Sequence, residues 1–338
     1  MTKQANPQSS NAMVILQRFG WSGQKVLGFF GQSQAFMLLA FLLFVLVVVT
    51  LLAPRFMTLD NMAVITRAAA FVALVSLGQM TCLTAGVIDL SVGAVGGFAG
   101  VCAALLMHDT TIEPYVCIAI GVLIGAAVGL VNGALITQLR LNPFIVTLSM
   151  SFIISGAILV VTGGWAIPDL PKKIEWMGRG SLFDRIPVPT LIAIGIAALL
   201  AFVLNRTYIG RHIFAMGGNK EAAILVGIPV NRLTTLVYVI SGSLAALAGV
   251  MMLARLASGQ PTVGQGWLLP SFAAPILGGA ALSGGAGSVF GTLVGAVLMA
   301  VISNSIVMTG MSVYWENVVV GAVLVGAIIM DRLRGEAS

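Results

Sequence analysis

Long apolar stretches alternate with short polar connections along nearly the whole chain from about residue 35 onward. Ten such stretches lie at positions 35–53, 63–85, 90–107, 116–138, 144–162, 188–205, 233–254, 271–283, 288–309 and 315–330. Most have the length of about 17 to 25 residues that carries an α-helix across a bilayer, and the eighth is the shortest. Because the stretches are continuous rather than alternating, they favour helices over the strands of an outer-membrane barrel. The pattern predicts an all-α polytopic membrane protein with about ten transmembrane helices.

These stretches divide the chain into three parts. Residues 1–34 are predicted to form a cytoplasmic N-terminal segment, residues 35–331 a transmembrane domain, and residues 332–338 a cytoplasmic tail. With the N-terminus inside, the cytoplasmic side holds Lys3, Arg18, Lys25, Arg140, Arg206, Arg211, Lys220, Arg232, Arg332 and Arg334, and the outer side holds Arg55, Lys172, Lys173, Arg179, Arg185 and Arg255. Since cytoplasmic loops collect Lys and Arg, this distribution predicts that both termini are cytoplasmic.

Composition supports the membrane assignment. The chain is 59% hydrophobic and 8% charged, whereas a soluble domain has about 25% charged residues. We therefore interpret the net charge of +6 as a result of basic residues in the loops between the membrane helices, and we expect no nucleic-acid partner. The 40 glycines suit helices that pack closely in a bilayer. Two series with a spacing of four residues predict such contacts, namely Gly121, Gly125 and Gly129, and Gly287, Gly291 and Gly295.

The sequence lacks the residue patterns of an enzyme. The two histidines, His108 and His212, fall on opposite sides of the membrane in this arrangement, and the three cysteines lie in or beside apolar stretches without a CxxC pair. No phosphate-binding loop, HExxH or GxSxG motif is present. We expect a transport protein that is not an enzyme, binds no metal or cofactor itself, and depends on another polypeptide if ATP drives it.

The polar segment 207–231 contains a short helix with its own start and stop signals. Asn219 is a good N-cap, and Glu221 places a carboxylate in the first turn, where it meets the helix dipole. Gly227 and Pro229 can end the helix, which leaves about two turns between Lys220 and Val226. A helix this short is marginal by itself, so its apolar residues need a surface to pack against. That surface is the protein's own helix ends, lipid headgroups or a separate cytoplasmic protein.

Other polar residues near helix ends have two interpretations. Asp89 precedes the apolar run that begins at Leu90, near the end of a span, where it can cap the helix; the alternative is a proton relay. Asn142 followed by Pro143 is a typical helix start. The glycine-rich breaks within Leu83–Gly100 and Ile276–Thr292 resemble each other, either as duplicated interrupted helices of a transporter or by chance similarity of composition.

Five motifs, in the same order along the chain, resemble the membrane permeases of ATP-binding-cassette importers for ribose, xylose, arabinose, related sugars and the autoinducer-2 signal. They are AGVIDLSVG at 85–93, LNPFIVTLSM at 141–150, GGNKEAAILVGIPV at 217–230, SGQPTVGQGW at 258–267 and ILGGAALSGGAGSVFGTLVGA at 276–296. The resemblance covers residues 35–331.

The resemblance implies roles for particular residues. The segment 210–230 looks like the coupling helix that fits a cleft of the ATPase subunit, with Gly217, Gly218, Asn219, Lys220, Glu221, Ala222, Ala223 and Gly227 as its ATPase-coupling residues. The residues expected at helix breaks or along the pathway are Asp89, Ser91, Gly93, Asn142, Pro143, Gly278, Gly279, Gly284 and Gly285.

The resemblance also implies partners and a location. Cytoplasmic ATPase subunits would bind ATP and Mg²⁺, a periplasmic binding protein would deliver a sugar or sugar-like solute, and a second permease copy or a paralogue would complete the pathway in the bacterial inner membrane. One stretch departs from the family, since Leu268, Leu269 and Pro270 replace its usual acidic residues in a loop expected to be external. The alternative function is an ion-coupled secondary transporter, which would also have interrupted helices.

Overall fold

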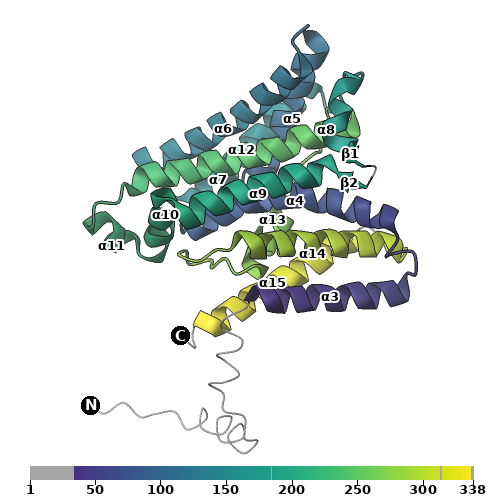
Figure 1. Ribbon diagram of the computed structural model, residues 1–338. Helices are drawn as coiled ribbons and strands as arrows, with labels where there is room; N and C mark the ends of the chain where they lie inside the picture. Colours follow the sequence, from purple (N-terminus) through teal and green to yellow (C-terminus); the bar gives the residue numbers. More distant parts are fainter. Residues whose placement is uncertain (1–33, 184, 313, 336–338) are drawn as a thin grey trace, which may run out of the picture.

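The structure, a computed structural model, describes residues 34–183, 185–312 and 314–335, and this part of the chain is built almost wholly of helices (Figure 1). The predicted N-terminal segment therefore lies outside the described residues except for residue 34, as do residues 336–338 of the predicted tail. The elements are α3 (Gln34–Leu52), α4 (Leu59–Thr84), α5 (Val92–Asp109), α6 (Pro114–Gln138), α7 (Pro143–Thr162), η2 (Lys172–Ile174), α8 (Glu175–Arg179), β1 (Ser181–Leu182), β2 (Ile186–Pro187), α9 (Val188–Arg206), α10 (Tyr208–Gly218), α11 (Lys220–Leu225), α12 (Val230–Leu256), α13 (Leu268–Leu277), α14 (Val289–Met308) and α15 (Trp315–Gly335).

Each predicted apolar stretch overlaps a helix. Within the described ranges, seven helices are long and apolar enough to cross a membrane, namely α4, α5, α6, α7, α9, α12 and α14. Shorter apolar segments lie in α3, in α13 and in α15. The eighth stretch departs most from expectation, because α13 has ten residues and is about 15 Å long, half the thickness of a bilayer core. Gly279 has a φ of 102° and stops the helix early, so α13 alone does not span the membrane.

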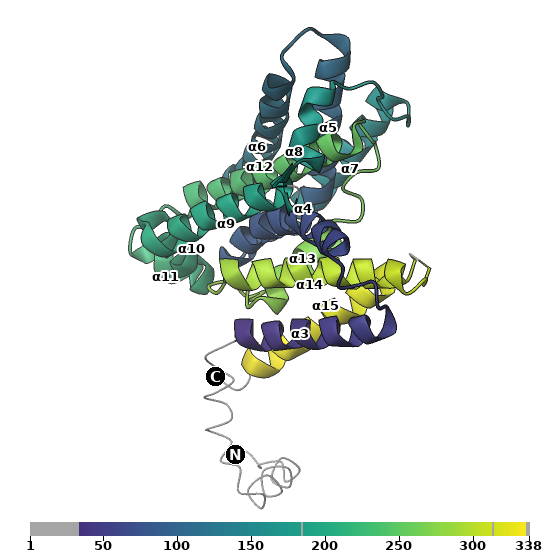
Figure 2. The ribbon, with the colours of Figure 1, turned by 45° about the vertical axis from the view of Figure 1, so that its right-hand side comes forward.

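Helix α4 lies at the centre of the bundle (Figures 1 and 2). It packs directly on α9, α12, α13 and α14. One apolar core combines residues of α4 with those of α5, α6, α7, α9 and α12, and a second combines them with those of α3, α13, α14 and α15. Leu74, Leu77 and Met80 are fully buried in the first core, while Ala69 and Ala73 face the second. Both groups of helices therefore depend on α4 for their relative position.

Glycines bring α6 and α12 into backbone contact, as their spacing predicts. A Cβ at Gly125 would meet the carbonyl oxygen of Gly242, and a Cβ at Gly129 would meet that of Tyr238. The second predicted series is also at a close contact, because a Cβ at Gly295 would meet the carbonyl oxygen of Ala274 in α13. Small residues at such crossings let helices gain dispersion contacts without a large side chain between them.

The two ends of the bundle differ. At one end, the α11 end, α10 and α11 lie beyond the long helices; at the other, the hairpin end, lie α8 and a hairpin of β1 and β2 that the sequence did not predict (Figure 1). The same outer connection pairs with the segment after α12, since Ile167 and Gly259 exchange backbone hydrogen bonds of 2.9 Å. The β1–β2 hairpin and the Ile167–Gly259 pairing connect loops to one another, and the fold remains all-α.

We expect Gly129→Ala to destabilise the bundle. The new Cβ would meet backbone atoms of α12, including Val239 Cα at 2.9 Å, and backbone cannot rotate away as a side chain can. Overpacking of this kind costs about 1–3 kcal/mol, so thermal unfolding of the detergent-solubilised protein should begin at a lower temperature. Gly156→Ala in α7 is the control, because nothing lies within 4 Å of its Cβ position. Equal melting temperatures for the two variants would refute the contact.

Candidate functional site

The predicted coupling segment forms two helices rather than one. The second, α11, is the short helix that the sequence predicts. The first, α10, was missed; Thr207 caps it by accepting a hydrogen bond from Gly210 N at 3.4 Å, and Ile213 and Met216 are buried beneath it. Its signal was the i, i+3 spacing of those apolar residues inside a segment that otherwise looks polar.

Helix α11 has the predicted caps at both ends. The Asn219 side chain accepts a hydrogen bond from Ala222 N at 2.9 Å, which satisfies one of the free amides of the first turn. At the other end Gly227 has a φ of 82°, and Ile228 N donates to Ala223 O at 3.0 Å, so a Schellman motif ends the helix. These local hydrogen bonds hold the shape of a helix that is too short to be stable by itself.

The outward face of α11 is apolar and without a partner among the described residues. Ala223 faces the protein and is 3% exposed, whereas Ile224, Leu225 and Val226 are 55%, 87% and 76% exposed. They stand beside exposed Lys220 and Glu221 in a polar connection. Adjacent exposed apolar side chains of this kind mark a surface that contacts another protein or lipid.

Gly217 joins this segment to the two glycine-rich breaks. A Cβ at Gly217 would meet the carbonyl oxygen of Thr84, at the end of α4, and would lie 2.6 Å from Gly285 N. The two breaks also contact each other, because Gly285 N donates to Thr84 O at 2.9 Å. A Cβ at Gly284 would lie 2.9 Å from Gly86 Cα. Residues predicted separately as coupling and as helix-break residues thus meet in one backbone contact at the α11 end.

The first break, residues 85–91, is held by a buried polar network around Asp89. Its Oδ1 accepts hydrogen bonds from Ser91 N at 2.9 Å and Ser91 Oγ at 2.6 Å, and its Oδ2 accepts one from Ser241 Oγ at 2.7 Å. Asn132 Nδ2 donates to Ser91 Oγ at 3.0 Å, and Tyr238 donates its hydroxyl to Ile88 O at 2.8 Å. Helices α6 and α12 therefore supply the polar partners that this break needs.

The depth of Asp89 corrects the sequence expectation. Asp89 is 1% exposed and level with Ser241, which lies 11 residues beyond the first residue of α12, or about 17 Å along the helix. It is not the cap of a helix beginning at Leu90, because α5 begins at Val92 with Ser91 as its N-cap. The sequence missed Ser241 and Asn132, whose only signal was a polar residue in an otherwise apolar helix.

The second break follows α13 and has the predicted glycine conformations. Gly279, Gly284 and Gly285 all have a positive φ, at 102°, 93° and 78°. Gly278 has an ordinary helical φ of −74°, and its role is spatial, since a Cβ there would meet the backbone of Gly291 in α14. Helix α14 then begins after Ser288, whose hydroxyl oxygen accepts a hydrogen bond from Gly291 N at 3.0 Å.

The stretch Leu268 to Pro270 is not in an external loop, which corrects the sequence expectation. It forms the first turn of α13. The preceding segment lies against α5, because a Cβ at Gly97 would meet the carbonyl oxygen of Val263. Gly264, with a φ of 89°, faces Gly93 so closely that a Cβ on either would meet the other's carbonyl oxygen. Gly93, which the sequence predicts at a helix break or along the pathway, is therefore a point where the segment before α13 closely approaches the backbone of α5. Asn142 and Pro143 lie apart from it and start α7 as predicted, with Asn142 Oδ1 accepting from Phe144 N at 2.9 Å.

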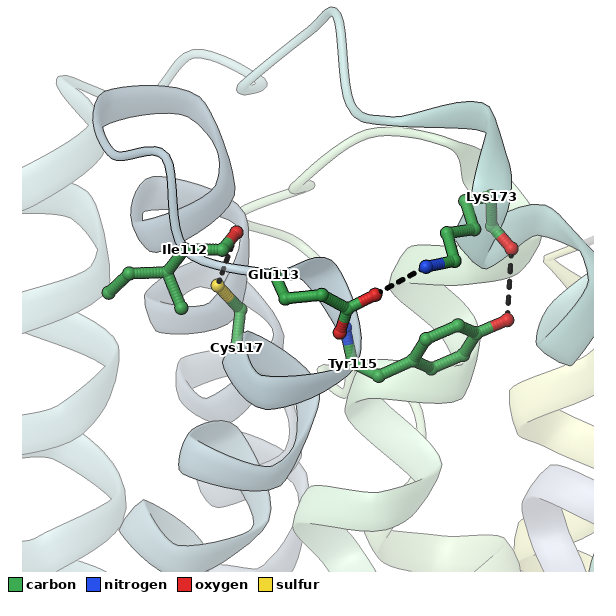
Figure 3. A network of polar contacts seen from close by, with 5 residues as sticks. All are labelled: Ile112, Glu113, Tyr115, Cys117 and Lys173. Carbon is green, nitrogen blue, oxygen red and sulfur yellow. Dashed lines mark hydrogen bonds and ion pairs between the residues drawn. The ribbon is translucent and has the colours of Figure 1, made fainter.

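A second polar network lies at the hairpin end (Figure 3). Glu113 accepts from Tyr115 N at 2.8 Å and pairs with Lys173 Nζ at 2.7 Å, and the Tyr115 hydroxyl donates to Lys173 O at 3.1 Å. The hydrogen bond from Lys173 lowers the pKa of the exposed Glu113 carboxyl, and the same contact raises the pKa of Lys173. Together they tie the start of α6 to the connection that carries η2.

We expect Asp89→Asn to retain both folding and transport, and Asp89→Leu to lose folded protein. An asparagine oxygen still accepts from Ser91 and its amide still donates to Ser241 Oγ, whereas leucine leaves buried hydroxyls unsatisfied at about 1–3 kcal/mol each. Monodispersity in detergent and solute uptake measure the two properties. If Asp89→Asn folds normally but abolishes uptake, the negative charge itself is needed, as a proton relay would require.

Comparison with known proteins identifies the family to which the chain belongs. A family model described as "Branched-chain amino acid transport system / permease component" matches residues 61–328. The chain is 35% identical to the ribose import permease protein of Escherichia coli (strain K12) over 298 residues, 87% of this chain and 92% of the relative. It is 34% identical to the D-allose transport system permease protein of the same strain over 284 residues, 83% and 86% of the two chains. The corresponding values for the L-arabinose ABC transporter permease protein of Azospirillum brasilense are 33% over 285 residues, 84% of each.

No solved structure matches the chain significantly. The family match covers most of the described helices, from the first turn of α4 into α15, and includes both breaks and the coupling segment. The chain is thus a multi-pass membrane protein, and it belongs to the transport-system permease family that this model describes.

Proposed function

We propose that this chain is the membrane-spanning subunit of an ATP-binding-cassette importer that moves a sugar or a similar small polar solute across the bacterial inner membrane. The relatives named above are permeases for ribose, D-allose and L-arabinose, which supports a sugar as the solute. The observation that carries the proposal is the contact of Gly217 with Thr84 and Gly285, because it links an exposed docking helix to both helix breaks.

The α11 end faces the cytoplasm in this proposal. Arg140, Arg206, Arg211, Lys220 and Arg232 all lie in or beside connections at that end. Cytoplasmic connections collect basic residues, so their position supports this orientation. Both termini then lie inside, as the sequence predicts, and the hairpin end faces a periplasmic binding protein.

The ATPase partner docks on the apolar face of α11. This chain hydrolyses no ATP; ATP and Mg²⁺ bind the partner, whose movement displaces α11 and, through Gly217, the ends of α4 and α13. Rigid displacement of helices around a fixed site is a common route to alternating access. A second copy of this chain or a paralogue supplies the other wall of the pathway.

The ion-coupled carrier is less well supported by the same geometry. Asp89 is buried deeply enough for such a role, but its carboxylate already accepts three hydrogen bonds from Ser91 and Ser241. A carboxylate satisfied in this way holds a break in place without needing to exchange a proton.

We expect Leu225→Asp to reduce recovery of the ATPase when the tagged chain is purified in mild detergent from its native membrane. Burial of an exposed leucine contributes about 1.5–3 kcal/mol, so its loss weakens binding about tenfold or more. Trp165→Asp at the hairpin end, also exposed, is the matched control. Undiminished ATPase recovery with Leu225→Asp would contradict docking at α11, and recovery of the chain alone, with transport driven by an ion gradient, would support the carrier.

We expect Gly217→Ala to separate ATP hydrolysis from transport. The methyl group would displace the Thr84 carbonyl and the Gly285 amide while leaving the outward face of α11 unchanged, so the ATPase should still co-purify. In proteoliposomes, the number of solute molecules imported per ATP hydrolysed should fall. Gly195→Ala in α9 has nothing within 4 Å of its Cβ position and should match the wild type. An unchanged ratio with Gly217→Ala would argue against this route of coupling.

A further inference from the structure

A cavity of about 220 Å³ lies where the deep end of the segment before α13 meets α5 and α7. Gly93 and Gly264 are among the residues that line it, and Ser151, Ser155 and Gln265 supply its polar side chains. Ser151 and Ser155 lie 9 and 13 residues beyond Asn142, the cap of the 20-residue helix α7, and so near the middle of its length. The cavity is therefore at mid-depth in the bundle, close to the start of α5.

The polar groups of this cavity are unused within the protein. The side chains of Ser151, Ser155 and Gln265 form no hydrogen bond with another residue in the described ranges, although most serines and threonines of the neighbouring helices bond to a carbonyl or a side chain. Ser155 and Gln265 are exposed and Ser151 is half-buried, so their hydroxyl and amide groups are open to the cavity that they line. A molecule in the cavity can therefore use them as hydrogen-bond donors and acceptors.

The chemistry of the lining selects a class of partner. The residues that line the cavity include no charged side chain, and the remaining wall is apolar, with Leu90, Ile158 and Leu268 beside the two serines. An ionic solute would find no counter-charge here. A sugar suits both parts of the wall, because its hydroxyl groups donate and accept hydrogen bonds while the C–H faces of its ring contact apolar side chains.

We propose that this cavity is a contact site for a neutral polyhydroxylated solute during its passage, with the hydroxyls of Ser151 and Ser155 and the amide of Gln265 as its hydrogen-bonding groups. The inference rests on the proposed importer function, which supplies the solute and the second subunit that closes the pathway. Leu268 lies in the first turn of α13 and lines the apolar part of this cavity.

Uptake by cells provides the test. The native gene is replaced by the double variant Ser151→Ala/Ser155→Ala or by Gln265→Ala, and uptake of radiolabelled D-ribose, D-allose and L-arabinose is measured. Each hydrogen bond removed should lower the uptake rate about fivefold at subsaturating sugar. Ser149→Ala is the control, because Ser149 is exposed on the same helix but does not line the cavity.

The outcomes separate the two proposals. If the wild type imports one of the sugars and the cavity variants match Ser149→Ala, the cavity assignment is wrong and the importer function stands. If the wild type imports none of the three, the proposed sugar function fails and the cavity assignment fails with it.

A second measurement guards against variants that do not fold. Cysteine at position 155 should react with a maleimide more slowly when the imported sugar is present at saturation, whereas cysteine at position 149 should react at one rate with or without sugar. Absence of protection in the Ser155→Cys variant would overturn the proposal even if the alanine variants were too unstable to assay.

Discussion

A break in a membrane helix leaves amide and carbonyl groups that hydrocarbon cannot satisfy, and this constraint organises the whole bundle. At the break of residues 85–91, α6 and α12 supply polar partners, namely Asn132, Tyr238 and Ser241. Those helices reach it because glycines let them approach each other at backbone distance. The packing of α6 against α12 thus places the side chains that form hydrogen bonds with the break.

The same constraint bears on the position of the segment that carries α10 and α11. Two breaks at one end of a bundle expose backbone groups, and they satisfy each other through the hydrogen bond from Gly285 to Thr84. Gly217 closes over that pair without a side chain. Under the proposed function, a displacement of α10 and α11 would act on the carbonyl and amide groups that hold the breaks together. It would reach both groups of helices through α4, which belongs to both apolar cores.

Sequence reasoning succeeded where the information is local. The caps Asn142, Asn219 and Gly227 were predicted because a cap depends on residues within one turn, and the positions of the apolar helices follow from hydrophobic runs. It failed where position depends on distant packing. Asp89 was expected near a span end, because nothing in its neighbourhood in sequence shows that an extended segment carries it inward to Ser241. Likewise Ser151 and Ser155 are ordinary serines in an apolar helix until α13 proves too short to span and its preceding segment meets them.

The contact of Gly217 with Thr84 and Gly285 consists of backbone atoms, whereas the cavity at mid-depth is lined by side chains. Under the proposed function, substitutions could therefore reshape the cavity residue by residue without altering the backbone contact that links α11 to the two helix breaks. A lineage of such chains could acquire new solutes while continuing to share one kind of motor subunit. The range of solutes could then change while the link between α11 and the helix breaks stays the same, because side chains line the cavity and main-chain atoms form the link.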